Sequence, residues 1–391
     1  MRKNICMIVY SNYLTDARVR REAETLASLP DYKVLVLALK ESGSPKTYIN
    51  KGVEVRELNV PKYRGKSNIK YLLSYIKFMS VASFYCNRLL MNNALSVIHV
   101  HNMPNFLVFS GIIPFLFGKK IILDVHDTMI ETYSAKFAGS SYGVLVRFLR
   151  FEESASCSFA HQIICVNDMQ KEALVKRGVP AKKITISINV PDPNIFDYKA
   201  RIIENTSTNK AFKLIYHGTV AKRLGIDLGI QAVAKLNGSI PGIEFNIMGE
   251  GDDLMEFMSL SKELGIHELI HFRNRAPLEE MVTEIEGMDL GVVSNRRNSA
   301  TELMLPVKML EYVALRIPVV APRLRTIEHY FSDDMVFYFD PDSVDSLADA
   351  IFDAFTHEDK RKNKAENALR FLEKYGWETH KLDLINLYAR L

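Results

Sequence analysis

The chain has 391 residues, of which 48% are hydrophobic and 25% charged, and its formal net charge at neutral pH is +4. This length exceeds what one hydrophobic core usually organises, so two domains are expected, and the composition is that of a globular protein without low-complexity tracts. No stretch approaches about 20 uninterrupted apolar residues, so no segment is expected to span a membrane.

The cysteines and the first residues indicate the compartment. The first apolar run is too short for a signal peptide. The four cysteines, Cys6, Cys86, Cys157 and Cys165, have neither CxxC nor metal-ligand spacing. Cys6 and Cys165 fall inside apolar runs typical of strands, as expected of buried reduced thiols. We therefore expect a cytoplasmic protein, either free or peripheral on the inner face of the cytoplasmic membrane.

The charge is divided unevenly along the chain. Residues 1–195 contain 26 Lys and Arg against 15 Asp and Glu, a net of +11, whereas residues 196–391 contain 24 against 31, a net of −7. Residues 58–123 contain eight Lys and Arg and no acidic residue. A basic half indicates an anionic partner, such as a phosphorylated substrate or lipid headgroups. We find no signature of nucleic-acid binding.

Two series of strands and helices follow each other. The first predicts strands at residues 5–10, 34–39, 53–60, 97–102, 120–126, 162–167 and 184–189, with a helix at 17–29. After a polar segment at 199–210, the second predicts strands at 212–218, 244–249, 269–274, 289–295, 317–322 and 336–340. The pattern predicts an α/β protein with two doubly wound Rossmann-like domains facing a cleft. The expected limits are 1–198, 199–375, and a C-terminal helix at 376–391 that packs back toward the first domain.

Glycines and basic residues follow the first strand of the second series. Gly218 ends the strand, and Lys222 and Arg223 precede a helix, which is the outline of a phosphate-binding loop. A solvated surface turn explains the same residues equally well. Gly249, after the next strand, would let a ligand approach the backbone, although a simple turn is as common.

The stretch LPVKMLEYVALRIPVVAP, residues 305–322, predicts a short helix followed by a buried strand. Lys308 lies in the first helical turn, where the helix dipole repels a cation by about 0.3–1 kcal/mol unless an anion is bound there. Glu311, on the same face, is suited to accept hydrogen bonds from ribose hydroxyls. The alternative is an ion pair between these two side chains on the surface.

Polar side chains also follow strands of the first series. His99 and His101 lie on one side of a predicted strand, and Asp124 and His126 end the next one. No helical pair of ligands at metal spacing accompanies them, so we predict hydrogen-bonding or acid–base roles and no metal. A structural role stays open for His99.

The ordered set of motifs resembles glycosyltransferase family 4, whose members are retaining enzymes with the GT-B fold. In the first half the resemblance rests on DARVRREAETLA, IHVHNMP and ILDVHD. In the second half it rests on YHGTVAKRLGIDLGIQAV, IMGEGDDL, HFRNRAPLEEM, DLGVVSN and the 305–322 stretch. The family implies a nucleotide-diphosphate sugar donor bound by the second domain, an acceptor bound by the first, and neither cofactor nor metal.

The resemblance also assigns roles to residues. It implies a catalytic role for His126 and a ribose contact for Glu311. The family's phosphate-binding Arg and Lys would fall on Thr219 and Leu224, neither of them basic, so we expect Lys222, Arg223 and Lys308, with Gly218, to bind the donor phosphates instead, and Lys308 to act in catalysis. Gly249, Arg275 and Ala276 would frame the base, and the acceptor side would contain Arg18, Arg20, His101 and Asn102. The sequence departs from the family pattern at Leu303, where the first Glu of its E-x7-E motif is expected, with Glu302 one residue away.

The basic first half bears on the acceptor. Its segment at residues 62–93 combines lysines with aromatic residues, which suits an anionic membrane surface, although a core helix with a solvated lysine edge fits as well. We predict transfer from a UDP-sugar, favoured over a GDP-sugar, to a glycan acceptor that is lipid-linked. Two alternatives stay open, a soluble small-molecule or protein acceptor, and a nucleotide-sugar-binding protein without transfer activity.

Overall fold

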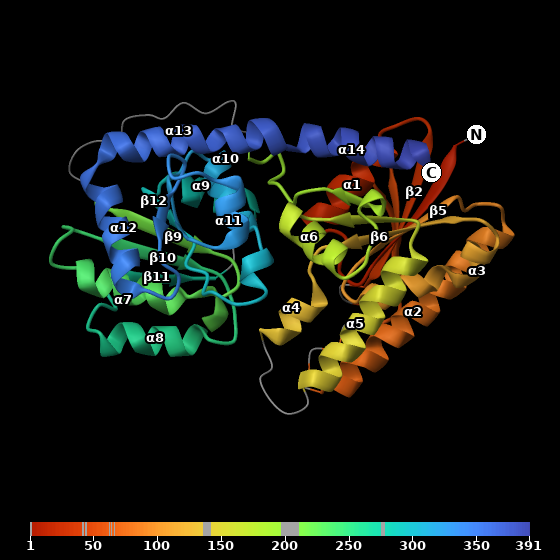
Figure 1. Cartoon of the computed structure of the whole chain (residues 1–391), viewed down its shortest axis with the longest axis horizontal. Helices are drawn as coiled ribbons and strands as arrows, with labels where there is room; N and C mark the ends of the chain where they lie inside the picture. The colour runs from red at the N-terminus through yellow and green to blue at the C-terminus, as the bar shows by residue number, and fades with distance from the viewer. Residues whose placement is uncertain are drawn as a thin grey trace. The chain divides into compact units, whose positions relative to one another are not determined.

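The computed structural model describes residues 2–40, 43, 45–61, 63, 65, 67–135, 142–196, 211–274 and 278–391. Contacts divide the chain into two units (Figure 1). Unit 1 comprises Met1–Asn189 and Glu378–Leu391, and unit 2 comprises Val190–Trp377. The predicted linker at 199–210 lies outside the described residues. The predicted α/β class with two Rossmann-like domains is confirmed by the two sheets below.

Unit 1 is built on an eight-stranded sheet in the order β3-β4-β2-β1-β5-β6-β7-β8. Every pair of neighbours is parallel except β3 and β4, which are antiparallel. The strands are β1 (Lys3–Val9), β2 (Tyr32–Leu39), β3 (Thr47–Asn50), β4 (Val53–Leu58), β5 (Val97–His101), β6 (Lys120–Val125), β7 (Gln162–Cys165) and β8 (Ile184–Ile186).

Helices cover both faces of this sheet, as the apolar strands require. They are α1 (Ala17–Ala27), α2 (Asn68–Met91), η1 (Asn105–Gly111), α3 (Ile112–Leu116), α4 (Met129–Ser134), α5 (Tyr142–Phe159), α6 (Asp168–Lys176), η2 (Ala181–Lys183) and α14 (Trp377–Arg390). Figure 1 shows α2, α3 and α5 together on one side of the sheet, and α1 and α14 on the other. Along β5, Ile98 and Val100 join the core under α2. His99 points the other way and contacts Tyr388 of α14.

Unit 2 has a six-stranded sheet, all parallel, in the order β11-β10-β9-β12-β13-β14. Its strands are β9 (Lys213–His217), β10 (Glu244–Met248), β11 (Ile270–Arg273), β12 (Leu290–Val292), β13 (Val319–Pro322) and β14 (Phe337–Phe339). Its helices are η3 (Lys222–Leu224), α7 (Ile226–Leu236), α8 (Leu254–Glu263), α9 (Leu278–Glu286), η4 (Thr301–Leu303), α10 (Val307–Ala314), α11 (Arg325–Tyr330), α12 (Val344–Thr356) and α13 (Glu358–Tyr375).

Two features of unit 2 position its polar residues. The sheet and the helices α7 and α12 enclose one apolar core. The short helix α10 begins at Val307 after Pro306, which occupies the N-cap position and has no N–H to satisfy. Within the described part of the chain, no helix is long and apolar enough to cross a membrane.

Candidate functional site

The helix α10 carries two of the predicted residues and is held closely against β12. A Cβ added at Gly291 would lie 2.4 Å from Cδ2 of Tyr312, so only glycine lets this ring lie on the strand. The Tyr312 hydroxyl is 3.3 Å from the Ile215 carbonyl oxygen and accepts from the His217 backbone N–H at 3.2 Å. These contacts fix the face of α10 that carries Lys308 and Glu311 at the carboxyl end of β9.

Glu311 is held by a histidine that the sequence did not single out. His217 donates from Nε2 to Glu311 Oε2 at 2.6 Å, and its Nδ1 lies 2.9 Å from the Tyr312 hydroxyl. One carboxylate oxygen is therefore occupied, while Oε1 makes no hydrogen bond within the described residues. The side chain is 14% exposed. This geometry leaves one carboxylate oxygen for a ligand hydroxyl.

Lys308 presents a buried ammonium. Its Nζ makes no hydrogen bond to any described residue and lies 3.5 Å from the centroid of the Tyr216 ring. Burial lowers the pKa of Lys308 to about 7, although the Glu311 carboxylate acts in the opposite direction. A Cβ on Gly218 would lie 3.5 Å from this Nζ, so the glycine and the ammonium adjoin. An ammonium in this state gains most from an anionic ligand, because it has lost its water without replacement.

The loops after β9 and β10 lie against each other through glycines. A Cβ on Gly249 would lie 1.8 Å from the Gly218 carbonyl oxygen, and one on Gly251 would lie 1.8 Å from that of Val220. The backbone N–H of Gly218 donates to Met248 at 2.9 Å. Gly249 is thus required by the packing of the two loops, whatever ligand it adjoins.

The two basic residues of η3 differ in their surroundings. Lys222 is exposed and its Nζ pairs with Glu256 at 2.8 Å. The Arg223 charge lies close enough to Lys308 to help lower its pKa. Of the two predicted phosphate ligands in this loop, Arg223 therefore adds positive potential near Lys308, whereas Lys222 has a carboxylate partner on α8.

The position of the missing family Glu is apolar. Leu303 is buried in η4, and the neighbouring Glu302 accepts from the Arg325 backbone N–H at 2.8 Å and pairs with Arg297 at 2.9 Å. Glu302 therefore caps the first turn of α11. The predicted base-framing residues Arg275 and Ala276 lie outside the described residues.

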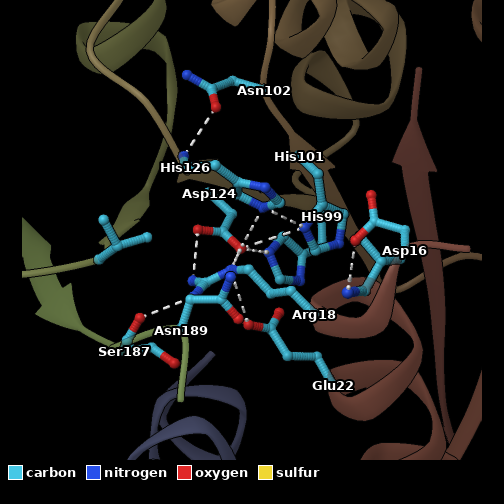
Figure 2. A network of polar contacts seen from close by, with 12 residues as sticks. Asp16, Arg18, Glu22, His99, His101, Asn102, Asp124, His126, Ser187 and Asn189 are labelled. Carbon is cyan, nitrogen blue, oxygen red and sulfur yellow. Dashed lines mark hydrogen bonds and ion pairs between the residues drawn. The ribbon is translucent and has the colours of Figure 1, made fainter. Parts of the chain in front are cut away.

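In unit 1, the predicted residues at the ends of β5 and β6 form one polar network (Figure 2). Arg18, from α1, donates through Nε and Nη2 to the two oxygens of Asp124 at 3.0 and 2.9 Å. His101 and His126 contact Asp124 Oδ2 at 3.2 and 3.1 Å. Burial acts to raise the pKa of Asp124, but Arg18 and the two histidines hold it well below its ordinary value. Asp124 is therefore an ionised carboxylate at the centre of the network.

His126 is the accessible member of this network. Its side chain is 22% exposed, whereas those of His101 and Asp124 are fully buried. Burial acts to lower the pKa of His126, but the Asp124 carboxylate outweighs it and raises that pKa above the usual value. The His126 backbone N–H donates to Asn102 Oδ1 at 2.8 Å. Asp124 and Asn102 thus hold His126 with its side chain partly exposed to solvent.

The predicted acceptor-side residues occupy different environments. Arg18 and His101 are buried and Asn102 bridges two loops, donating to Asp127 and Asn105 at 2.8 and 2.9 Å, so these three hold His126 in place. Arg20 lies away from the network, paired with Glu24 and bonded to the Leu14 carbonyl. The structure therefore brings three of the four together.

Sequence reasoning missed two partners in the same network. Glu22, one turn after Arg18 on α1, is buried 3.4 Å from the Arg18 guanidinium. Tyr388 of α14 contacts His99 Nδ1 at 2.8 Å. Ligand atoms of Glu22, His99, His101 and Asp124 lie within 4.8 Å of one another, a grouping able to hold a metal ion. The Arg18 guanidinium, however, contacts both carboxylates of this group and compensates their charge.

Comparisons with known proteins show which families and folds this chain is similar to. Residues 17–192 match the family model Glycosyltransferase Family 4, and residues 199–371 match the model Glycosyl transferases group 1. A D-inositol 3-phosphate glycosyltransferase of Corynebacterium urealyticum is 24% identical over 245 residues, which cover 59% of this chain and 57% of that protein.

Two solved structures share the fold over the full chain. The sucrose-phosphate synthase of Thermosynechococcus elongatus has a TM-score of 0.78 at 17% identity and covers 100% of this chain and 99% of its own. The HepE protein of Anabaena, solved with UDP and glucose, has a TM-score of 0.71 at 14% identity, covering 100% of both chains. Both similarities concern the fold alone.

Proposed function

We propose that this chain, a glycosyltransferase with two Rossmann-like domains, moves a sugar from a nucleotide-diphosphate sugar to a glycan acceptor. The observation that carries the proposal is Lys308, a buried ammonium without a hydrogen-bond acceptor among the described residues, beside Gly218 and at the first turn of α10. A donor diphosphate would supply the missing negative charge. The same charge would be favoured by the N-terminus of α10.

The donor would be oriented by Glu311. The free Oε1 would accept hydrogen bonds from the ribose hydroxyls, while His217 keeps the carboxylate in place through Oε2. Arg223 would add positive potential near the diphosphate. We favour UDP over GDP as the nucleotide, and the HepE structure contains UDP in a protein of the same fold.

Transfer would require stabilisation of the leaving diphosphate. Lys308 is placed to neutralise charge that develops on the phosphate oxygen as the sugar bond breaks. The departing oxygen would take the proton of the acceptor hydroxyl, and His126 would contact the transferred sugar. We propose retention of the anomeric configuration, as the family resemblance implies.

For the acceptor we propose a lipid-linked glycan, because unit 1 carries the basic surplus of the chain. A soluble acceptor is the second candidate, and the name of the D-inositol 3-phosphate glycosyltransferase describes such an acceptor for that protein. The apolar Leu303 at the position of the family Glu motivates the third candidate, binding without transfer.

A panel of nucleotide sugars tests the proposal. Binding is measured as thermal stabilisation by UDP, GDP and ADP, and transfer by mass spectrometry of products formed with lipid-linked and soluble acceptors. Proton NMR of the product assigns its anomeric configuration. Lys308→Ala and His126→Ala should lose transfer, whereas Lys262→Ala, an exposed lysine of α8, should retain it. Full activity in both site variants would refute the scheme.

A further inference from the structure

The helix α2 exposes an apolar stripe to solvent. Ile69, Leu73, Ile76, Phe84 and Met91 recur at helical spacing and are 40–83% exposed. The opposite side of the helix, with Phe78, is buried in the core of unit 1. A helix that is apolar on both sides normally lies in a protein interior or at a membrane interface.

Two neighbouring helices also expose apolar side chains. On α5, Val144, Phe148 and Phe151 are spaced one helical turn apart and are 55–74% exposed. At the end of α3, Leu116 and Phe117 are 75% and 69% exposed.

These three helices are contiguous. Phe115 of α3 contacts Phe159 of α5 with ring centroids 4.7 Å apart, and α2 packs directly against α3. Figure 1 shows the three helices grouped on one side of the unit 1 sheet. We call these exposed apolar residues and the cations between them the α2–α3–α5 face.

The charges of this face have one sign. Its exposed charged residues on the three helices are all basic: Lys70, Lys77, Arg88, Arg147 and Arg150. The acidic residues that these helices carry, Glu152 and Glu153 of α5, are both buried beneath the surface. Glu152 accepts from Asn105 and from the Phe106 backbone N–H, so it belongs to the interior.

We propose that the α2–α3–α5 face binds an anionic lipid bilayer, with its apolar side chains inserted at the boundary between headgroups and acyl chains. Basic side chains interleaved with exposed Phe, Leu and Ile match such a surface in both charge and polarity. A second copy of the chain fits less well, because like-charged faces repel each other. The inference rests on the proposed function, because it identifies the surface at which the enzyme would reach a lipid-linked acceptor. Vesicle binding is measured without any transfer reaction, so it can fail while the proposed transfer activity holds, and the reverse.

The test is cosedimentation of the full chain with vesicles of phosphatidylcholine, with and without phosphatidylglycerol. Binding is expected on the anionic vesicles and should weaken as salt is added. The double variant Leu116→Ser, Phe117→Ser should lower the partition coefficient about tenfold or more. Met255→Ser, which removes an equally exposed apolar side chain from α8 of unit 2, should leave the partition coefficient unchanged; Leu116 and Met255 are each 75% exposed.

A fluorescence readout separates insertion from simple adhesion. The single native tryptophan, Trp377, is 8% exposed and gives a constant background. In Phe117→Trp the new indole should shift its emission to the blue on anionic vesicles. Absence of binding to anionic vesicles, or equal binding by the double variant, would overturn the proposal. So would a dimer in solution that the double variant abolishes, since the face would then be an interface between copies.

Discussion

The Lys308 ammonium lies 3.5 Å from the centroid of the Tyr216 ring and has no hydrogen-bond acceptor in the described part of the chain. The ring face and the Glu311 charge attract it, but neither replaces the hydrogen bonds that it makes in water. Its pKa is consequently lowered to about 7. Lys308 should therefore lower the stability of the free protein and favour binding of an anionic ligand, and both effects can be measured.

The first consequence is a pH dependence of nucleotide binding. Below pH 7 the free protein already carries the Lys308 proton, whereas above the pKa of about 7 binding of a diphosphate must be accompanied by uptake of a proton. The affinity for UDP should therefore fall as pH rises above 7, by up to about tenfold per unit. Calorimetry at pH 8 in buffers of different ionisation enthalpy should detect the proton uptake. Lys308→Met should lose it, and an unchanged proton uptake in this variant would assign it to another group.

The second consequence concerns stability. Because the pKa of Lys308 is lower in the folded chain, at about 7, than in the unfolded chain, the penalty is absent above the unfolded pKa of about 10.4. It grows as pH falls toward 7 and is complete below 7. Lys308→Met should therefore raise the free energy of unfolding on the order of a few kcal/mol at pH 7 and by much less near pH 10. Urea denaturation at both pH values checks the difference, and a variant less stable than wild type at pH 7 would contradict it.

Glu311 provides a test of the ribose contact. Glu311→Gln keeps an oxygen to accept from His217 Nε2 but loses the charge offered to the ligand hydroxyls. We expect UDP affinity to fall about tenfold or more, with little change in stability. Glu263→Gln, an exposed residue of α8 bonded to Ser259, is the matched control. Isothermal titration calorimetry with UDP and with ribose 5-phosphate, which lacks the base, would show whether the lost contact is to the ribose.

The sequence predicts features that depend on neighbouring residues, but not contacts between residues far apart along the chain. The strands of both sheets and the short helix with Lys308 follow from apolar runs and from Pro306, which act locally. Tyr216, whose ring adjoins Lys308, is about 90 residues away in sequence, and Tyr388 meets His99 across 289 residues. Such pairs depend on sheet order and register, which periodicity does not specify. The antiparallel edge strand β3 was missed because it has only four residues, too few for an alternating pattern to stand out, and none of them is buried.

Exposure is the second property that the sequence could not decide. The segment around α2 was consistent with either a core helix or a membrane-binding one. In the structure one side of α2 is buried in the core, as Phe78 is, while apolar side chains on the other side are exposed, as Leu73 is at 58%. Likewise, Arg18 was predicted to face an acceptor, but it is buried against Asp124. An arginine in a first helical turn carries no local signal for the carboxylate that it will meet from β6.

The Arg18–Asp124 pair predicts a strong effect of charge removal. Asp124→Asn removes the closer of the two buried carboxylates that pair with Arg18 and leaves only Glu22, at 3.4 Å, so it should lower the free energy of unfolding by about 3–5 kcal/mol. The double variant Arg18→Met, Asp124→Leu should recover part of that stability but no transfer activity, because His126 loses its partner. Urea denaturation and product analysis separate the two effects. A double variant that is as unstable as Asp124→Asn would show that the charge is not the cause.

The same carboxylate predicts an acid limit. The pKa of Asp124 is lowered in the folded chain, so its contribution to stability is present above the unfolded pKa of about 3.9 and is lost as pH falls below it. The stability of wild type should consequently decline between pH 4 and lower values more steeply than that of the Arg18→Met, Asp124→Leu variant. Acid titration followed by circular dichroism measures both curves, and parallel curves would contradict the prediction.

A substitution at Gly291 tests whether the position of α10 against β12 determines donor binding by Lys308 and Glu311. Its added Cβ would lie 2.4 Å from the Tyr312 ring, so Gly291→Ala must displace the helix that carries Lys308 and Glu311. We expect a loss of about 1–3 kcal/mol in stability and a decrease in UDP affinity that persists at temperatures where the variant is fully folded. Gly287→Ala is the control, because its Cβ would meet no atom closer than the Glu284 carbonyl oxygen at 3.7 Å. If Gly291→Ala lost stability but bound UDP as wild type does, the donor site would not depend on the position of α10, and the assignment of Lys308 and Glu311 to it would fail.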